Sequence, residues 1–262
     1  MWPAGRVATL AVALSCAILF AACAARHSHA RPVAGARPSD RRMEAARSPV
    51  SIGRSVGGAR IYATEAGAAR RAQADLLVVG CIHGNEPAGI AVSEQLRQRL
   101  ASKPLDAWLV DDLNPDGRAA DKRQNARGVD LNRNFPWRWQ PLGPRGTQQY
   151  SGPRPLSEPE ARAAFALVRR VRPRIAIWFH QPLAVVDESG GSVAVERRFS
   201  RLSGLPLRRL QRYPGSAVGW EDHAVPGSTA FVVELPPGPL TPQRAASLAA
   251  AVIALASGAG SH

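Results

Sequence analysis

The chain has 262 residues, of which 45% are hydrophobic and 21% are charged. These proportions exclude an intrinsically disordered protein and fit one sizeable folded domain with a short appendage. The formal net charge of +14 at pH 7 either favours contact with an anionic polymer such as a bacterial wall or simply reflects an Arg-rich composition. Because no basic run is interleaved with aromatic residues, we do not expect nucleic-acid binding.

Residues 1–22 have the pattern of an export signal. Arg6 is followed by the uncharged, apolar stretch 7–25, which ends in small residues around Cys23. The segment Phe20-Ala21-Ala22-Cys23 resembles the lipobox of bacterial lipoproteins, although Phe20 stands where that motif prefers an aliphatic residue. Ordinary secretion and an uncleaved signal anchor are the alternatives. We therefore expect an exported protein of the bacterial envelope or a secreted one, with membrane attachment through a lipid on Cys23 or through the N-terminal stretch.

The segment after the signal differs in composition from the rest of the chain. Residues 23–50 are rich in Arg, Ala, Pro and Ser and show no hydrophobic periodicity, so we expect a flexible tether. A folded domain should occupy residues 51–262. Its single cysteine, Cys81, cannot form an internal disulfide, and we expect it to be a buried strand residue rather than a metal ligand.

Within this domain, apolar strands alternate with helices. The sequence predicts strands at 75–82, 107–113, 174–179 and 229–234, and helices at 88–100, about 159–171 and 242–256. Ser157 and Glu160 form a capping-box pattern with Pro159 in the first helical turn, and residues 114–117 read as a turn. The alternation predicts an α/β fold in which helices cover both faces of the sheet.

Four polar residues lie at the ends of the predicted strands, namely His83, Asn114, His180 and Glu234. In α/β sheets, functional sites gather at the carboxyl ends of the strands. Zinc hydrolases use imidazole and carboxylate ligands and leave one position for water. His83 and Glu86 supply one of each, and His180 is the best third ligand because it ends an apolar strand. The remaining histidines lie in the tether, at the tail or in a predicted loop.

Between the candidate ligands lies an ordered set of motifs. They are Asn114-Pro115-Asp116-Gly117, then a stretch from Arg123 to Phe135 that contains Asp130-Leu131-Asn132-Arg133, then Tyr150-Ser151-Gly152-Pro153 and Leu156-Ser157-Glu158-Pro159-Glu160. Over roughly residues 51–240, this set resembles the zinc carboxypeptidase family of the carboxypeptidase A kind. His180-Gln181-Pro182-Leu183, Pro214-Gly215-Ser216 and Glu234-Leu235-Pro236-Pro237 are similar to its murein peptide amidase branch. The resemblance implies a mixed, largely parallel sheet with helices on both faces.

The resemblance also implies roles around one bound zinc ion. The family's metal ligands fall on His83, Glu86 and His180, and its general base falls on Glu234. Asp130 matches a carboxylate that orients the first histidine ligand. Paired with an arginine, Glu234 would instead be structural.

Four further residues match the family's substrate-binding groups. Arg123 matches the arginine that polarises the scissile carbonyl, and Asn132 with Arg133 matches the pair that holds the substrate's terminal carboxylate. Tyr213 matches a tyrosine over that carboxylate, but it lies closer to the following glycine than the family pattern expects.

Together these features predict a zinc-dependent metallocarboxypeptidase or amidase that hydrolyses an amide bond near a free carboxylate. By the resemblance to the amidase branch, its substrate is a peptide or muropeptide, cut between γ-D-glutamate and diaminopimelate. One alternative is an aspartoacylase-like or desuccinylase-like deacylase of N-acyl amino acids. Another is a non-catalytic wall-binding module, which the complete set of ligands and Glu234 disfavours.

Overall fold

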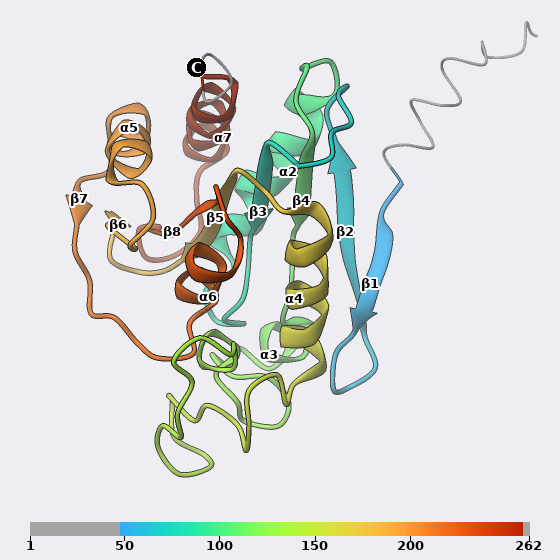
Figure 1. The fold of residues 1–262 in the computed structure, drawn as a ribbon, viewed down its shortest axis with the longest axis vertical. Helices are drawn as coiled ribbons and strands as arrows, with labels where there is room; N and C mark the ends of the chain where they lie inside the picture. Colours follow the sequence, from blue (N-terminus) through green and yellow to red (C-terminus); the bar gives the residue numbers. More distant parts are fainter. Residues whose placement is uncertain (1–47, 259–262) are drawn as a thin grey trace, which may run out of the picture. The chain divides into compact units, whose positions relative to one another are not determined.

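An eight-stranded mixed sheet forms the centre of the computed structural model, which describes residues 48–258 (Figure 1). Its strands are β1 (Val50–Arg54), β2 (Arg60–Ala66), β3 (Leu76–Val79), β4 (Ala107–Val110), β5 (Ile175–His180), β6 (Val185–Asp187), β7 (Leu207–Arg208) and β8 (Thr229–Glu234). They lie in the order β1-β2-β4-β3-β5-β8-β6-β7. The central strands β4, β3, β5 and β8 are parallel to one another, which confirms the predicted fold class.

Helices cover both faces of this sheet. They are α2 (Ala88–Leu100), α3 (Pro115–Ala119), α4 (Pro159–Val171), α5 (Val193–Ser203), α6 (Ala217–Ala224) and α7 (Pro242–Ser257), with a 3-10 turn at Leu131–Arg133. One apolar core joins α2, α5 and α7 to the sheet, and a second joins α4 and α6 to the opposite face. Strand β5 serves both, because Ile177 faces the first core and Trp178 the second.

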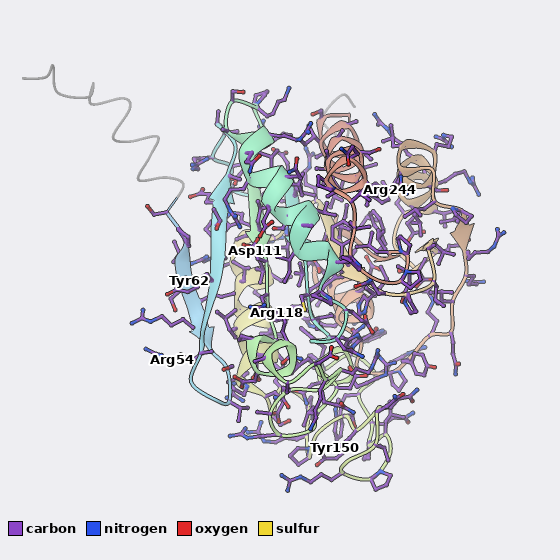
Figure 2. The ribbon with its side chains drawn as sticks, turned by 180° about the vertical axis from the view of Figure 1, so that it is seen from behind. Arg54, Tyr62, Asp111, Arg118, Tyr150 and Arg244 are labelled. Atoms are coloured by element: carbon purple, nitrogen blue, oxygen red, sulfur yellow. The ribbon has the colours of Figure 1, made fainter. Side chains whose placement is uncertain are left out.

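The predicted N-terminal features lie largely outside the described residues. The export signal at 1–22, Cys23 and nearly all of the tether at 23–50 belong to this part of the chain. The described residues begin with the antiparallel pair of β1 and β2 at one edge of the sheet, where Arg54 and Tyr62 are labelled in Figure 2. From residue 48 to residue 258, no helix is both long enough and apolar enough to cross a membrane.

Several local predictions need correction. Helix α4 does occupy 159–171, but its N-cap residue is Glu158 and no side chain caps it. The Ser157 hydroxyl is used elsewhere, because it donates to Glu158 Oε1 at 2.8 Å and accepts from Asn134 Nδ2 at 2.9 Å. The expected turn at 114–117 is the start of helix α3, in which Asn114 Oδ1 accepts from the Gly117 amide. The strands predicted at 75–82 and 107–113 end earlier, at Val79 and Val110.

Candidate active site

Three predicted ligands converge at the carboxyl end of the central strands. His83 and Glu86 lie in the loop after β3, His180 ends β5, and their exposed fractions are 1%, 8% and 3%. His83 Nδ1 and His180 Nδ1 are 3.0 Å apart, and Glu86 Oε2 lies 3.0 Å from the first and 2.9 Å from the second. Zinc bonds of about 2.0–2.1 Å place the corners of a coordination tetrahedron about 3.3 Å apart. The triangle therefore has the size and the donor atoms of one face of a zinc site.

A buried carboxylate holds the first of these ligands. Asp130 Oδ1 lies 2.9 Å from His83 Nε2, so it accepts that N–H and leaves Nδ1 facing the triangle. Arg123 donates from Nε to Asp130 Oδ2 at 3.0 Å and from Nη1 to Glu86 Oε1 at 2.9 Å. Arg123 therefore connects the metal-site carboxylate to the carboxylate behind the histidine.

The charge states of Glu86, Asp130 and His180 suit metal binding, whereas burial lowers the pKa of His83 but the charge of Asp130 outweighs it and raises that pKa above its usual value. Burial opposes the charge on Glu86, but its contacts with the His180 and His83 imidazoles outweigh burial, so the pKa of Glu86 lies well below its usual value. Burial also opposes the charge on Asp130, and His83 and Arg123 bring its pKa below the usual value. Burial lowers the pKa of His180 to about 4, so this imidazole is neutral at pH 7. A charged carboxylate and a neutral imidazole are the forms that bind a metal ion.

The loop that carries His83 and Glu86 rests directly on helix α3. A Cβ atom at Gly84 would lie 2.0 Å from the carbonyl carbon of Gly117, so only glycine permits this contact. Asn114 ties the same region together, because its Nδ2 donates at 3.2 Å to Ile82 O and at 3.2 Å to Arg123 O. Asn114 was predicted to lie at a strand end near the site, and the structure gives it this supporting position rather than one in the metal cluster.

Glu234 lies beside the triangle without joining it. It ends β8 directly opposite His180, its register partner at the end of β5. The Leu183 amide donates to its carboxylate, and Oε2 is buried with no hydrogen-bond partner among residues 48–258. Burial, followed by the negative charge of Glu86, raises the pKa of Glu234 to about 7. The structure therefore places a carboxylate with one free oxygen at the edge of the candidate metal site.

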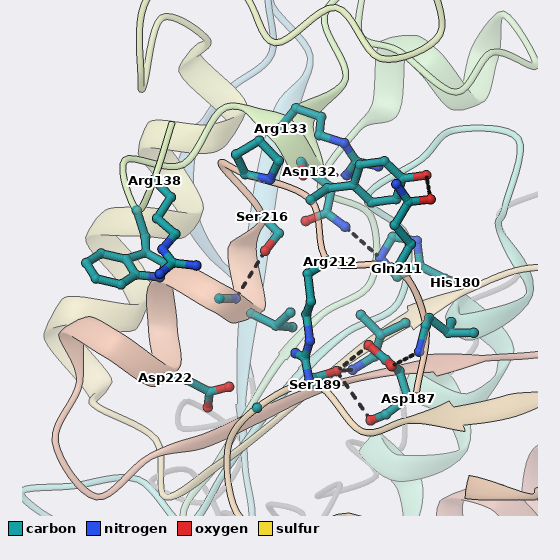
Figure 3. Close-up of a pocket in the computed structure, with 18 of the residues that line it drawn as sticks. Asn132, Arg133, Arg138, His180, Asp187, Ser189, Gln211, Arg212, Ser216 and Asp222 are labelled. Carbon is teal, nitrogen blue, oxygen red and sulfur yellow. Dashed lines mark hydrogen bonds between the residues drawn. The ribbon is translucent and has the colours of Figure 1, made fainter. Parts of the chain in front are cut away.

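A cavity of about 920 Å³ opens in front of these groups (Figure 3). His83, His180 and Glu234 line it, together with the predicted substrate-binding residues Arg123, Asn132, Arg133 and Tyr213. Arg133 is 4% exposed, and its guanidinium carbon lies 3.9 Å from the centre of the Tyr213 ring. Its Nη1 donates to Asn132 O at 2.8 Å, whereas its buried Nε has no partner in the described part of the chain.

Asn132 is more constrained than the sequence indicated. Its Oδ1 accepts from the Ala217 amide at 2.9 Å, and its Nδ2 lies 3.3 Å from His180 Nε2. The side chain therefore joins the start of α6 to a candidate metal ligand while it lines the cavity.

The residues at the cavity's other end were not predicted from the sequence. Asp187, Ser189, Arg212 and Asp222 also line it, toward the lower part of the view in Figure 3. They come from β6, the loop after it, the segment before α6, and α6 itself. No motif marks them, and the two-residue and three-residue strands nearby are too short to show a hydrophobic period.

Comparisons with known proteins agree with this geometry. A sequence profile described as zinc carboxypeptidase matches residues 41–192. Murein peptide amidase A from Vibrio campbellii is 31% identical over an alignment of 204 residues that covers 72% of this chain and 80% of that protein. The gamma-D-glutamyl-L-diamino acid endopeptidase 1 of Lysinibacillus sphaericus is 31% identical over an alignment of 168 residues that covers 57% of this chain and 38% of that protein. A crystal structure of murein-tripeptide amidase from Escherichia coli O157 superposes with a TM-score of 0.62 at 30% identity, over 80% of this chain and 92% of that chain.

Proposed function

Because the chain belongs to the zinc carboxypeptidase family, we propose that it is a zinc-dependent amidase of peptidoglycan stem peptides, which cleaves between γ-D-glutamate and diaminopimelate. One observation carries the proposal: two of the three convergent ligands, His83 and His180, border the same cavity as Glu234 and the buried Arg133. The relatives named for murein peptides and for γ-D-glutamyl-diamino acid bonds support the choice of substrate.

We assign the metal to His83, Glu86 and His180. Two imidazoles and one carboxylate leave a coordination position open, as catalytic zinc sites require. A bound zinc ion supplies a Lewis acid for the scissile carbonyl and lowers the pKa of a bound water to about 7. Asp130 keeps His83 in the tautomer that ligates, and Arg123 fixes the second oxygen of Glu86.

Glu234 is the proposed general base. Its free Oε2 accepts the proton of the attacking water and then delivers it to the nitrogen of the leaving amine. A pKa near 7 in the absence of metal suits both steps, and a nearby dication lowers that pKa. At neutral pH, Glu234 is therefore in the charged form that accepts a proton.

Arg133 and Arg123 receive the substrate. The planar guanidinium of Arg133, held by Tyr213 and by Asn132 O, suits a carboxylate next to the scissile bond. The Asn132 carbonyl oxygen already accepts from the Ala217 amide. Arg133 therefore supplies the positive charge that binds the substrate carboxylate. Arg123 uses Nε and Nη1 for Asp130 and Glu86, and we assign its Nη2 to the oxygen that becomes negative during attack.

A substrate panel tests this function. The zinc-loaded protein should cleave L-alanyl-γ-D-glutamyl-diaminopimelate and release diaminopimelate, which mass spectrometry detects directly. Ordinary peptides with a free C-terminus and N-acyl amino acids complete the panel, because they represent general carboxypeptidases and deacylases. Cleavage confined to the N-acyl amino acids would identify a deacylase instead, and zinc-loaded protein inert on all three classes would identify a binding module.

We also propose that the protein is exported and anchored to the membrane through Cys23, which the sequence pattern of residues 1–23 supports. When the full-length chain is expressed in a bacterium with a fatty-acid probe, the wild type should be labelled and Cys23→Ser should not. Cys16→Ser is the matched control and should keep the label. A label that persists in Cys23→Ser would contradict lipidation at this residue.

A further inference from the structure

The far end of the cavity contains a carboxylate with an unused oxygen. Asp222 lies on α6, and its Oδ1 accepts from the Ala230 amide at 2.7 Å. Its Oδ2 is buried and has no hydrogen-bond partner within residues 48–258. Burial raises the pKa of Asp222 to about 6. A buried carboxylate oxygen without a donor costs free energy, and an ammonium group entering the cavity would supply both the donor and the charge.

The two neighbouring acids differ from Asp222 in different ways. Both oxygens of Asp187 accept hydrogen bonds, Oδ1 from the Leu210 amide at 2.8 Å and Oδ2 from Ser189 Oγ at 2.9 Å. Glu196 accepts from the Ser189 amide at 2.9 Å and its Oε2 is also buried without a partner in the described structure, but Glu196 is fully buried and does not line the cavity. Of these three acids, Asp222 is therefore the one that both lines the cavity and has an oxygen without a hydrogen-bond partner in the described structure.

Arg212 brings a positive charge to the same end. Its guanidinium donates to the backbone oxygen of Glu188 and forms no ion pair with Asp222 in the described structure. Two consecutive glycines, Gly190 and Gly191, lie next to the Arg212 and Asp222 side chains. A Cβ at Gly190 would lie 3.1 Å from Arg212 Nη1, and a Cβ at Gly191 would lie 2.8 Å from Asp222 Oδ1. The absence of side chains at these glycines thus leaves room for a positive group and a negative group at the same end of the cavity.

The cavity therefore has charged groups at both ends. Figure 3 shows Asn132 and Arg133 toward one end of the view and Ser189 and Asp222 toward the other. Val218 and Val232 also line the space. A residue held at Arg133 by its carboxylate can extend an aliphatic stem past these valines. The group at the tip of that stem would meet Asp222 and Arg212.

We propose that Asp222 and Arg212 select the residue on the leaving side of the scissile bond by binding an amino-acid group at the end of its side chain. Asp222 takes the ammonium and Arg212 takes the carboxylate. This inference rests on the proposed function, in which the leaving residue is a diamino acid. A side chain that ends in an ammonium alone, as in lysine, would bind Asp222 but offer no carboxylate to Arg212. A side chain that ends in a methyl group would bind neither residue.

The test compares three leaving residues in two series of substrates. Meso-diaminopimelate, lysine and norleucine are each attached to a γ-D-glutamyl group and, separately, to benzoylglycine. The wild-type kcat/KM should fall in that order. Asp222→Asn keeps the acceptor for Ala230 but loses the charge, so it should lower the lysine-to-norleucine ratio of kcat/KM by about 10- to 100-fold. Arg212→Gln should lower the diaminopimelate-to-lysine ratio and leave the lysine-to-norleucine ratio unchanged.

Glu221→Gln is the matched control. Glu221 precedes Asp222 on α6 and is fully buried, but it bonds Trp178 Nε1 at 3.1 Å and does not line the cavity, so both ratios should stay at wild-type values. Calorimetry with free diaminopimelate, lysine and norleucine measures their dissociation constants, whose ratios should show the same preferences without turnover. Wild-type protein that does not distinguish lysine from norleucine, or Asp222→Asn that still does, would overturn the proposal. Selectivity that depends on Asp222 in the benzoylglycyl series, with no cleavage of γ-D-glutamyl substrates, would instead overturn the proposed function alone.

Discussion

Glu234→Gln should lower kcat on the γ-D-glutamyl substrate by about 10²–10⁴-fold or more, the usual contribution of a general acid–base group. Glutamine preserves the shape and can still accept from the Leu183 amide, but it cannot take a proton from water. Because Glu234 is not in the triangle of ligand atoms, the zinc content of the variant should equal that of the wild type. Stopped assays of kcat, with elemental analysis of the same samples, measure both quantities.

The pH dependence gives this prediction a second readout. A base acts in its charged form, so wild-type kcat/KM should rise with pH as Glu234 loses its proton, at or below pH 7 in the metal-bound enzyme. The residual kcat/KM of Glu234→Gln should not show this rise with pH. Glu94→Gln, on the exposed side of α2, serves as the control and should behave as the wild type. Near-normal turnover in Glu234→Gln, or loss of its zinc, would show that another residue is the base.

His180→Ala should lose both bound zinc and turnover. The substitution leaves two ligands, and a site with an open position depends on all three protein ligands to hold the ion. His83→Ala should have the same effect, because it removes the ligand that Asp130 orients. Protein purified without chelator should contain one zinc per wild-type chain by elemental analysis.

His223→Ala is the matched control for these two variants. His223 borders the same cavity, but it stacks on Trp137 and lies outside the triangle of ligand atoms. It should retain its zinc. Stoichiometric zinc in both His83→Ala and His180→Ala would exclude the proposed site.

The positions of the candidate ligands could be predicted because parallel strands bring their carboxyl ends together. Once 174–179 and 229–234 were assigned as strands, His180 and Glu234 had to lie at the same edge of the sheet, and the structure places them as register partners. The lengths of the strands were overestimated at 75–82 and 107–113, because apolar residues such as Ile82 and Leu113 continue into the buried loops that carry the site.

The far end of the cavity could not be predicted in this way. Its chemistry depends on which atoms remain unpaired after folding, and Asp187 and Asp222 look equivalent as isolated acids in the sequence. Only the tertiary contacts distinguish them, since both oxygens of Asp187 accept hydrogen bonds, from Ser189 and Leu210, while one oxygen of Asp222 has no partner in the described structure. The failed capping box has a similar origin, because Asn134, more than twenty residues away, binds the Ser157 hydroxyl.

The contact between Gly84 and Gly117 has a consequence for how the enzyme acquires its metal. Backbone packs on backbone behind the ligand loop, and the Asn114 amide bonds Ile82 on one side and Arg123 on the other. The positions of His83 and Glu86 are therefore set by the scaffold and do not depend on the ion. Metal uptake should then require little reorganisation of the chain, so the free energy of coordination goes into affinity rather than into ordering a loop.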